Sequence, residues 1–233
     1  MSGPLFIHPA ESRRRFQEFA DGEITNANLV EGALLIALED YPQLDMEAPL
    51  AQLDDLAERV KRRASPGEPP VFKVGQLHAE MFDVDGYDGD RASYNDPRNA
   101  YLNEVVARRK GLPISLSIIF LHVADRIGLQ ASGVGLPGHF IVKVQFELNE
   151  LYVDPFNAGA TLTLPEVSAL LDTMTDGEVR LSSQHLRAWS GREILMRVLA
   201  NIMNMQNRAG DQKKAAAARE RIALLQKKSE KEE

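Results

Sequence analysis

The residues of this chain best suited to chemistry are Ser115, His139 and Asp154. The serine stands near the predicted start of a long apolar helix, where backbone N–H groups and the helix dipole favour developing negative charge. The histidine opens a predicted strand, and the aspartate closes the strand that follows. A hydroxyl nucleophile, an imidazole base and a carboxylate that orients the imidazole are the groups that acyl transfer needs. A Ser-His-Asp acyl-transfer site is therefore one hypothesis.

Each of these residues also has a purely structural interpretation. Ser115 and Ser117 stand where serine hydroxyls cap a helix or bond back to its own carbonyls. His139 fits a hydrogen-bonded core histidine, and Asp154 precedes Pro155 in a sequence typical of a turn. Taken singly, each residue fits this interpretation better. The three together, in the order nucleophile, histidine and aspartate, fit a papain-type site geometry about as well as they fit the structural interpretation.

The other histidines and the acidic residues do not predict a metal site. His122 lies seven residues after Ser115, on the same helical face, where packing accounts for it. The loop from Asp83 to Asp90 is rich in Asp and Gly. However, Tyr87 falls where a calcium ligand is needed, and no Glu closes the loop at the twelfth place. We favour a solvated loop and expect neither metal nor cofactor. Three more histidines lack metal-ligand spacing: His8, His78 and His185.

The composition limits the classes of function. The 233 residues include no cysteine, which excludes disulfides, thiolate metal sites and a cysteine nucleophile. The net charge of −7 and the pI near 5.4 argue against a general nucleic-acid or anionic-membrane binder, because both need a basic face. The first residues show no signal-peptide pattern. The longest apolar run, 114–124, is shorter than the roughly 20 residues of a spanning helix. We therefore expect a cytoplasmic protein.

The spacing of apolar residues predicts mostly helices before residue 128. The predicted helices are 11–20, a second capped by Thr25 or Asn26 and ending at Tyr41, then 45–63, 71–82, 98–110 and 114–127. The last of these is apolar nearly all the way round. A helix of that kind belongs in the middle of a domain rather than on its surface.

After Gly128 the apolar period changes to two. This predicts strands at 132–135, 139–146 and 151–154, with a turn at Asn149-Glu150. In that register His139 and Asp154 can be neighbours across the ladder. A short helix follows at 164–171, and two helices joined at Gly210 form a hairpin of tetratricopeptide type. Helices followed by antiparallel strands predict an α+β fold.

Several motifs carry a resemblance to a known family. NDPRNAYLNEVVARRKGLPISLSIIFLHVADRIGL, GVGLPGHFIVKV and LYVDPFNAG resemble the transglutaminase-like family named after the bacterial invasion regulator Sir-B. ALLIALEDYPQLD and SGREILMRVLANIMNMQNRAGD also match that family. The resemblance implies a papain-related core of a buried central helix against a small antiparallel sheet. It implies three segments: a helical region at 1–94 packed on the core, the core at 95–188, and a tetratricopeptide-like hairpin with a charged tail at 189–233. The superfamily's catalytic His and Asp fall on His139 and Asp154.

The nucleophile of that family does not carry over. Active transglutaminases and related peptidases use a Cys at the start of the central helix. Counting back from Gly128 puts this position at or near Pro113, with Ser115 two residues further on. Proline cannot act as a nucleophile. A serine is far less acidic than a thiol, so Ser115 would need a better base.

Three hypotheses follow, in order of preference. The first is a non-catalytic module that binds a protein or peptide or acts as a regulator. The second is an amide hydrolase or acyl transferase that uses Ser115, His139 and Asp154. The third assigns all three residues to packing and turns. The second hypothesis requires Ser115 Oγ within hydrogen-bonding reach of one ring nitrogen of His139, with the other nitrogen facing Asp154.

Overall fold

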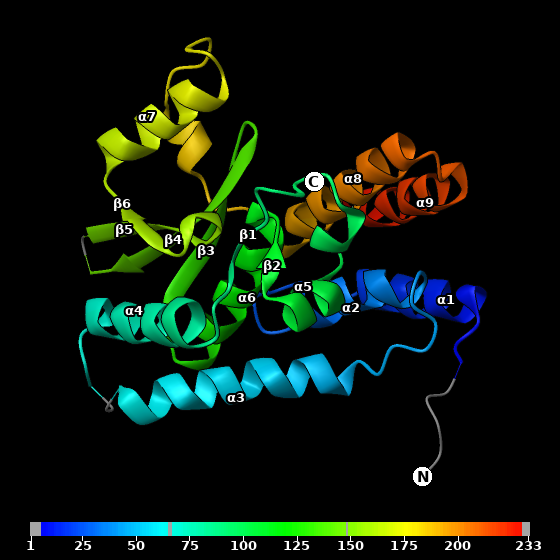
Figure 1. The fold of residues 1–233 in the computed structure, drawn as a ribbon, viewed down its shortest axis with the longest axis horizontal. Helices are drawn as coiled ribbons and strands as arrows, with labels where there is room; N and C mark the ends of the chain where they lie inside the picture. Colours follow the sequence, from blue (N-terminus) through cyan, green and yellow to red (C-terminus); the bar gives the residue numbers. More distant parts are fainter. Residues whose placement is uncertain (1–5, 65–66, 148, 230–233) are drawn as a thin grey trace.

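Helix α6 (Pro113–Arg126) runs through the centre of the molecule (Figure 1). The structure is a computed structural model that describes residues 6–64, 67–147 and 149–229. Every residue of α6 from Pro113 to Ala124 is buried, and the helix contacts strands as well as helices. An apolar helix of this kind has to be covered on all sides. The central buried helix that the sequence predicts is confirmed.

A four-stranded antiparallel sheet follows α6 in the order β3-β4-β5-β6. On one face Phe140 and Val142 join the main core, which includes α6. On the other face Ile141 and Tyr152 form a second apolar cluster that includes residues of α7 (Leu164–Met174). Helices therefore cover both faces of the sheet, and the predicted α+β fold is confirmed. The strands are Gln130–Leu136, His139–Phe146, Asn149–Asp154 and Ala160–Leu162.

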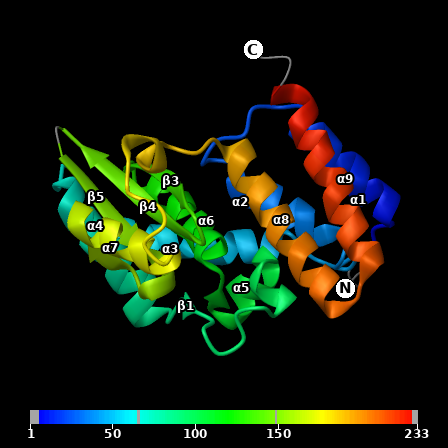
Figure 2. The ribbon, with the colours of Figure 1, turned by 90° about the horizontal axis from the view of Figure 1, so that it is seen from above.

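The remaining elements surround this centre (Figures 1 and 2). In Figure 2, α8 lies beside α9, and α9 lies beside α1. A two-stranded parallel pair, β1 (Asp88–Gly89) and β2 (Lys110–Gly111), borders the start of α6. The helices and helical turns are α1 (Pro9–Ala20), α2 (Leu29–Leu38), α3 (Glu47–Arg63), α4 (Pro70–His78), η1 (Ala79–Val84), η2 (Pro97–Asn99), α5 (Leu102–Arg108), η3 (Pro155–Asn157), η4 (Ser183–Leu186), α8 (Gly191–Ala209) and α9 (Gln212–Ser229).

The C-terminal hairpin of α8 and α9 shares the core of the other segments. Ile194 and Leu225 belong to the same apolar cluster as α2 and α6. Arg221 of α9 is 0% exposed and donates to the carbonyl of Ile36 at 2.6 Å. A buried guanidinium is tolerated only where acceptors meet it, so this contact fixes α9 against α2. Residues 230–233 of the predicted charged tail lie outside the described residues.

The helix predicted over 98–110 is instead the 3-10 turn η2 followed by α5, which ends at Arg108 because Arg109 is left-handed, with a φ of 58°. Two further predicted helices differ from the structure for local reasons. Helix α2 does not begin directly after Thr25 or Asn26, because Asn28 Oδ1 accepts the N–H of Thr25 and forms a turn first. The helix predicted over 71–82 changes its hydrogen-bonding pattern at Ala79 and continues as the π-helical η1.

The turn predicted at Asn149-Glu150 is wrong. Both residues belong to β5, where they pair with Phe146 and Gln145 of β4. The chain reverses earlier, where Glu147 has a φ of 52°. A positive φ is uncommon for a non-glycine residue, and nothing in the local sequence marks this one. In the resulting register of β4 against β5, Val142 pairs with Val153.

Candidate functional site

Strands β4 and β5 bring His139 and Asp154 together. His139 is the first residue of β4 and follows the turn at Gly138, whose φ is 75°. Asp154 is the last residue of β5. The imidazole Nε2 lies 2.8 Å from Asp154 Oδ2, and only 3% of the histidine and 1% of the aspartate side chain are exposed. This is a buried, hydrogen-bonded pair, a class of contact that is costly to break.

The carboxylate of Asp154 is held by the turn that follows it. Its Oδ1 accepts the N–H groups of Phe156 at 3.1 Å and Asn157 at 3.3 Å, and its Oδ2 also accepts from the Asn157 side-chain amide. A carboxylate accepts hydrogen bonds, so the Nε2 of His139 carries the proton that Asp154 receives. In the neutral imidazole Nδ1 is then the acceptor nitrogen, and no described residue donates to it.

Ser115 takes part in a different set of contacts. Its Oγ donates to the carbonyl of Asn99 at 2.7 Å and accepts the N–H of Leu112 at 2.9 Å. The single hydroxyl proton is therefore already used. The residue is 1% exposed, and within the described residues no hydrogen bond joins it to His139. Ser117 bonds to the carbonyl of Pro113 at 2.8 Å. The structure thus brings two of the three predicted site residues together and leaves Ser115 bonded to backbone.

A small cleft borders His139. Pro113 and Ile114 line it from the start of α6, and Arg197 and Asn201 line it from α8. Pro113, at or next to the position that the resemblance assigns to a nucleophile, therefore shares this cleft with the imidazole. The cavity volume is about 20 Å³, close to the minimum that holds one water molecule. The cleft can admit a terminal group but not a length of peptide chain.

Sequence reasoning did not single out three of the residues that line this cleft: Tyr94, Arg197 and Asn201. Arg197 and Asn201 are four residues apart on α8, so they share one face of the helix. The signal in the sequence that could have identified Arg197 and Asn201 is their polar character next to the apolar stripe of α8. Tyr94 packs edge-on against Phe156, with ring centroids 5.8 Å apart. Burial raises the pKa of the Tyr94 hydroxyl, and the nearby charge of Arg197 opposes that rise.

His122 forms a second histidine–aspartate contact, within the helical packing. Its Nε2 lies 3.2 Å from Asp54 Oδ1 and its Nδ1 lies 3.2 Å from the guanidinium of Arg126. The side chain is 0% exposed. Burial first, and then the charge of Arg126, lower the pKa of His122 to about 4. Both ring nitrogens face protein groups, in agreement with the packing interpretation.

The acidic loop at 83–90 directs its carboxylates to basic side chains. Asp85 pairs with Arg59 at 2.7 Å and Asp90 with Arg108 at 3.0 Å. In residues 6–64, 67–147 and 149–229, no group of three or more His, Asp or Glu side chains converges as metal ligands would. No helix in these ranges is both long enough and apolar enough to cross a membrane.

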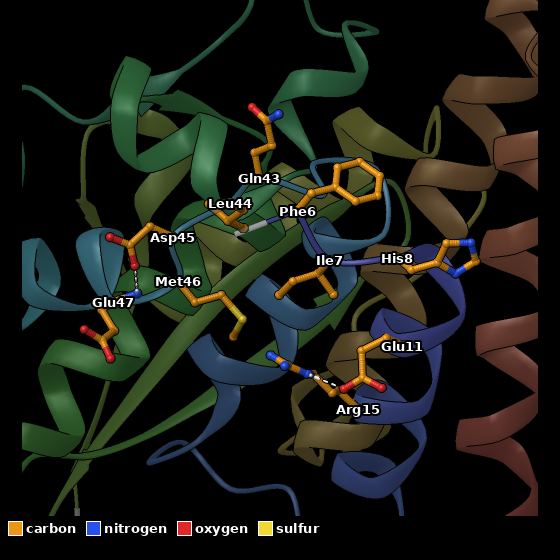
Figure 3. Close-up of a pocket in the computed structure, with 10 residues that line it drawn as sticks. All are labelled: Phe6, Ile7, His8, Glu11, Arg15, Gln43, Leu44, Asp45, Met46 and Glu47. Atoms are coloured by element: carbon orange, nitrogen blue, oxygen red, sulfur yellow. Dashed lines mark hydrogen bonds and ion pairs between the residues drawn. The ribbon is translucent and has the colours of Figure 1, made fainter. Parts of the chain in front are cut away.

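A larger cavity, of about 900 Å³, lies between the segment that leads into α1 and the connection from α2 to α3 (Figure 3). Phe6, Leu44 and Met46 contribute apolar walls, and the carboxylate of Glu11 is bonded to Arg15. None of its lining residues lines the cleft at His139. This cavity offers space, but it lacks a combination of groups suited to acyl transfer.

Comparison with known proteins gives a consistent group of relatives. The family model described as transglutaminase-like superfamily matches residues 47–200. A UPF0162 protein of Xylella fastidiosa is 34% identical over 200 residues, which cover 84% of this chain and 71% of that protein. A UPF0162 protein of Pseudomonas aeruginosa is 29% identical over 201 residues, 84% of this chain and 72% of its own. Human F-box only protein 21 is 24% identical over 216 residues, 78% of this chain and 33% of its own. No solved structure gives a significant match.

Proposed function

The chain belongs to the transglutaminase-like superfamily, and from this premise we propose that it is a non-catalytic member that binds a protein or peptide at the cleft beside His139. The single observation that carries the proposal is the residue at the start of α6. Pro113 lines the same cleft as His139, and a proline side chain has no group that can attack a carbonyl carbon. The histidine and the aspartate of an acyl-transfer site are present without the nucleophile.

The contacts of Ser115 support the same proposal. To act as a nucleophile, its Oγ would have to release the carbonyl of Asn99 and the N–H of Leu112. The Leu112 N–H and the Asn99 carbonyl would keep their own 3.2 Å hydrogen bond, but the two contacts of the hydroxyl would be lost in the interior, at a cost of about 1–3 kcal/mol. The hydroxyl would also have to approach His139, to which it has no hydrogen bond in the described structure. The absence of cysteine from the whole sequence leaves no thiol to take its place.

The His139–Asp154 pair can take part in ligand binding without a nucleophile. Asp154 fixes the orientation of the imidazole through a 2.8 Å hydrogen bond, and Nδ1 is left as an acceptor. An acceptor nitrogen on a residue that lines the cleft can bind a ligand that brings a donor. The cleft volume of about 20 Å³ suits the end of a chain or a single side chain, so the body of a partner would lie outside it.

We also propose the finer classification that the motifs imply. In it, the chain is of the Sir-B type, with a helical region at 1–94, a transglutaminase-like core at 95–188, and a tetratricopeptide-like hairpin and tail at 189–233. The pairing of α8 with α9 supports the hairpin. The matched family region, 47–200, extends past both proposed boundaries, and the three segments share one apolar cluster. We therefore propose that the three segments are parts of one packed unit and not separate domains.

The absence of catalysis can be tested with a serine-directed fluorophosphonate probe. We expect no labelling of the full chain, because Ser115 Oγ is buried and bonded to backbone. Labelling that disappears in Ser115→Ala and in His139→Ala would overturn the proposal and support the Ser115–His139–Asp154 enzyme. Labelling that persists in Ser115→Ala would point to another residue as the nucleophile.

The binding role can be tested by selecting peptides from a displayed random library on the full chain. Sequences enriched on the wild type should lose at least tenfold in affinity with His139→Gln, which keeps a polar side chain but not the imidazole. The matched control is His185→Gln, outside the cleft, which should leave affinity unchanged. A library that yields no enriched sequence, or peptides that bind all three proteins equally, would contradict binding at this cleft.

A further inference from the structure

Arg197 of α8 is a cation without a protein partner in the part of the chain that the structure describes. It is partly buried and lines the cleft of His139, yet it has neither a hydrogen bond nor an ion pair with a described residue. One arginine before it in the chain, Arg187, and one after it, Arg208, are engaged. Arg187 pairs with Glu193 at 2.6 Å, and Arg208 donates to Asn95 at 2.7 Å. In a protein of net charge −7, an unpaired guanidinium beside a cavity calls for a specific explanation.

Asn201 extends the same feature by one helical turn. It lines the cleft together with Arg197, and its side chain has no hydrogen bond with a described residue. Residues at i and i+4 lie one above the other on a helix face. The two side chains can therefore direct several N–H donors to one ligand. The pKa of Tyr94 responds to the charge of Arg197, which indicates that the guanidinium is close to this wall of the cleft.

The cleft contains no acidic side chain to neutralise Arg197. Its lining comprises aromatic, apolar and neutral polar residues besides the arginine and His139. The carboxylate bonded to His139, that of Asp154, already receives hydrogen bonds from the imidazole, from two backbone N–H groups and from Asn157. The positive charge on this side of the cleft is therefore available to a ligand.

We propose that Arg197 and Asn201 bind a carboxylate of the peptide partner at the α8 wall of the cleft, while Nδ1 of His139 on the opposite wall accepts an N–H of the same partner. This inference rests on the proposed binding function and names the group that the cleft recognises. A guanidinium presents paired N–H donors whose spacing matches the two oxygens of a carboxylate, and the amide of Asn201 adds a further donor. A carboxylate is also small enough to sit at the mouth of so small a cavity. It can come from the C-terminus of a peptide or from an Asp or Glu side chain.

Three small probes separate these sources. N-acetylglycine carries a terminal carboxylate, N-acetylglycinamide is its uncharged match, and N-acetylaspartic acid methylamide carries only a side-chain carboxylate. Each is titrated into the isotope-labelled full chain, and NMR follows the side-chain N–H signals of Arg197 and Asn201. We expect at least one acid to shift both signals in a saturable way, and the amide to leave them in place. The acid that binds more tightly identifies the source of the carboxylate.

Variants of the full chain complete the test. Arg197→Gln should weaken the binding of that acid at least tenfold, because it removes a charge-assisted contact. Arg219→Gln removes the same charge from an exposed position of α9 and should change affinity less than twofold. The inference is overturned if neither acid binds, if acid and amide bind alike, or if Arg197→Gln binds as well as the wild type. If peptides selected on the wild type still depend on His139 in that case, the carboxylate subsite fails and the proposed function stands. If the acids bind but no peptide is selected, the proposed function fails instead.

Discussion

Two histidine–aspartate pairs in this molecule have different surroundings. His122 contacts Asp54 through one ring nitrogen and faces Arg126 with the other. His139 contacts Asp154 through Nε2, and its Nδ1 has no hydrogen-bond donor among the described residues. The Asp54 side chain is 49% exposed, whereas that of Asp154 is 1% exposed. The first pair belongs to a packed helix surface and the second to a cleft.

The comparison shows that the anchoring of the carboxylate distinguishes a site from a packing contact. Asp154 is fixed by backbone N–H groups of the next turn, so it can hold an imidazole in one orientation. Asp54 interacts with two side chains, His122 and Arg126, at the edge of the protein. A histidine with one oriented nitrogen and one free nitrogen can serve a ligand. A histidine with both nitrogens engaged contributes mainly to packing.

The largest effect should come from removing each carboxylate in turn. Asp154→Ala leaves a buried imidazole and the N–H groups of Phe156 and Asn157 without their acceptor, and we expect a loss of about 3–5 kcal/mol in the free energy of unfolding. Asp54→Ala removes a half-exposed partner from the buried imidazole of His122, and we expect a loss of about 1–2 kcal/mol. Urea denaturation of both variants at pH 7 measures the difference. Equal losses would contradict the distinction between the two pairs.

The pH dependence of stability should reveal the buried imidazole of His122. Its pKa of about 4 in the folded protein lies below the ordinary 6.5, so between these values the unfolded chain binds more protons. Stability is therefore complete above pH 6.5 and falls as the pH decreases towards 4, by up to about 3 kcal/mol from this residue. His122→Asn should lose that part of the dependence. Parallel stability curves for the wild type and this variant would show that His122 is not held in its neutral form.

The sequence alone predicts the central helix and the strands because their periods are local properties. The full apolar circumference of 113–124 requires burial, and the alternation after Gly128 requires strands. The sequence also identifies His139 and Asp154, whose contact requires only neighbouring strands. Their exact register is not predictable in this way, because the turn at Glu147 uses a left-handed residue with no local signature.

The contribution of α8 to the cleft is not predictable from the sequence by the same reasoning. Arg197 and Asn201 meet His139 only because of how the hairpin packs against the start of α6, which depends on contacts between distant segments. The role of Ser115 is also not predictable from the sequence, because its position near the start of a helix suggests a nucleophile. Its actual role depends on the carbonyl of Asn99, which the fold brings to it from η2.

A smaller effect on stability should follow from replacing Ser115 of α6 with alanine. Ser115→Ala removes a donor to Asn99 and an acceptor for Leu112 in the interior, and we expect a loss of about 1–2 kcal/mol in the free energy of unfolding. Ser117→Ala is the control, because its hydroxyl bonds only to a carbonyl of its own helix, and it should cost less. A Ser115→Ala variant as stable as the wild type would argue against the structural role of this hydroxyl.

The most direct test of the central claim restores the missing group. In Pro113→Cys, a thiol would stand at a helix start beside His139, and a nearby imidazolium and helix N-terminus both favour the thiolate. Alkylation by iodoacetamide at pH 6 should be at least tenfold faster than in Pro113→Cys/His139→Ala, and faster than in Ser115→Cys, where the thiol is buried. That result would mean that residue 113 separates this chain from a working nucleophile–histidine–aspartate arrangement. Equal rates in the single and the double variant would contradict the account, because His139 would then not be placed to activate a group at the start of α6.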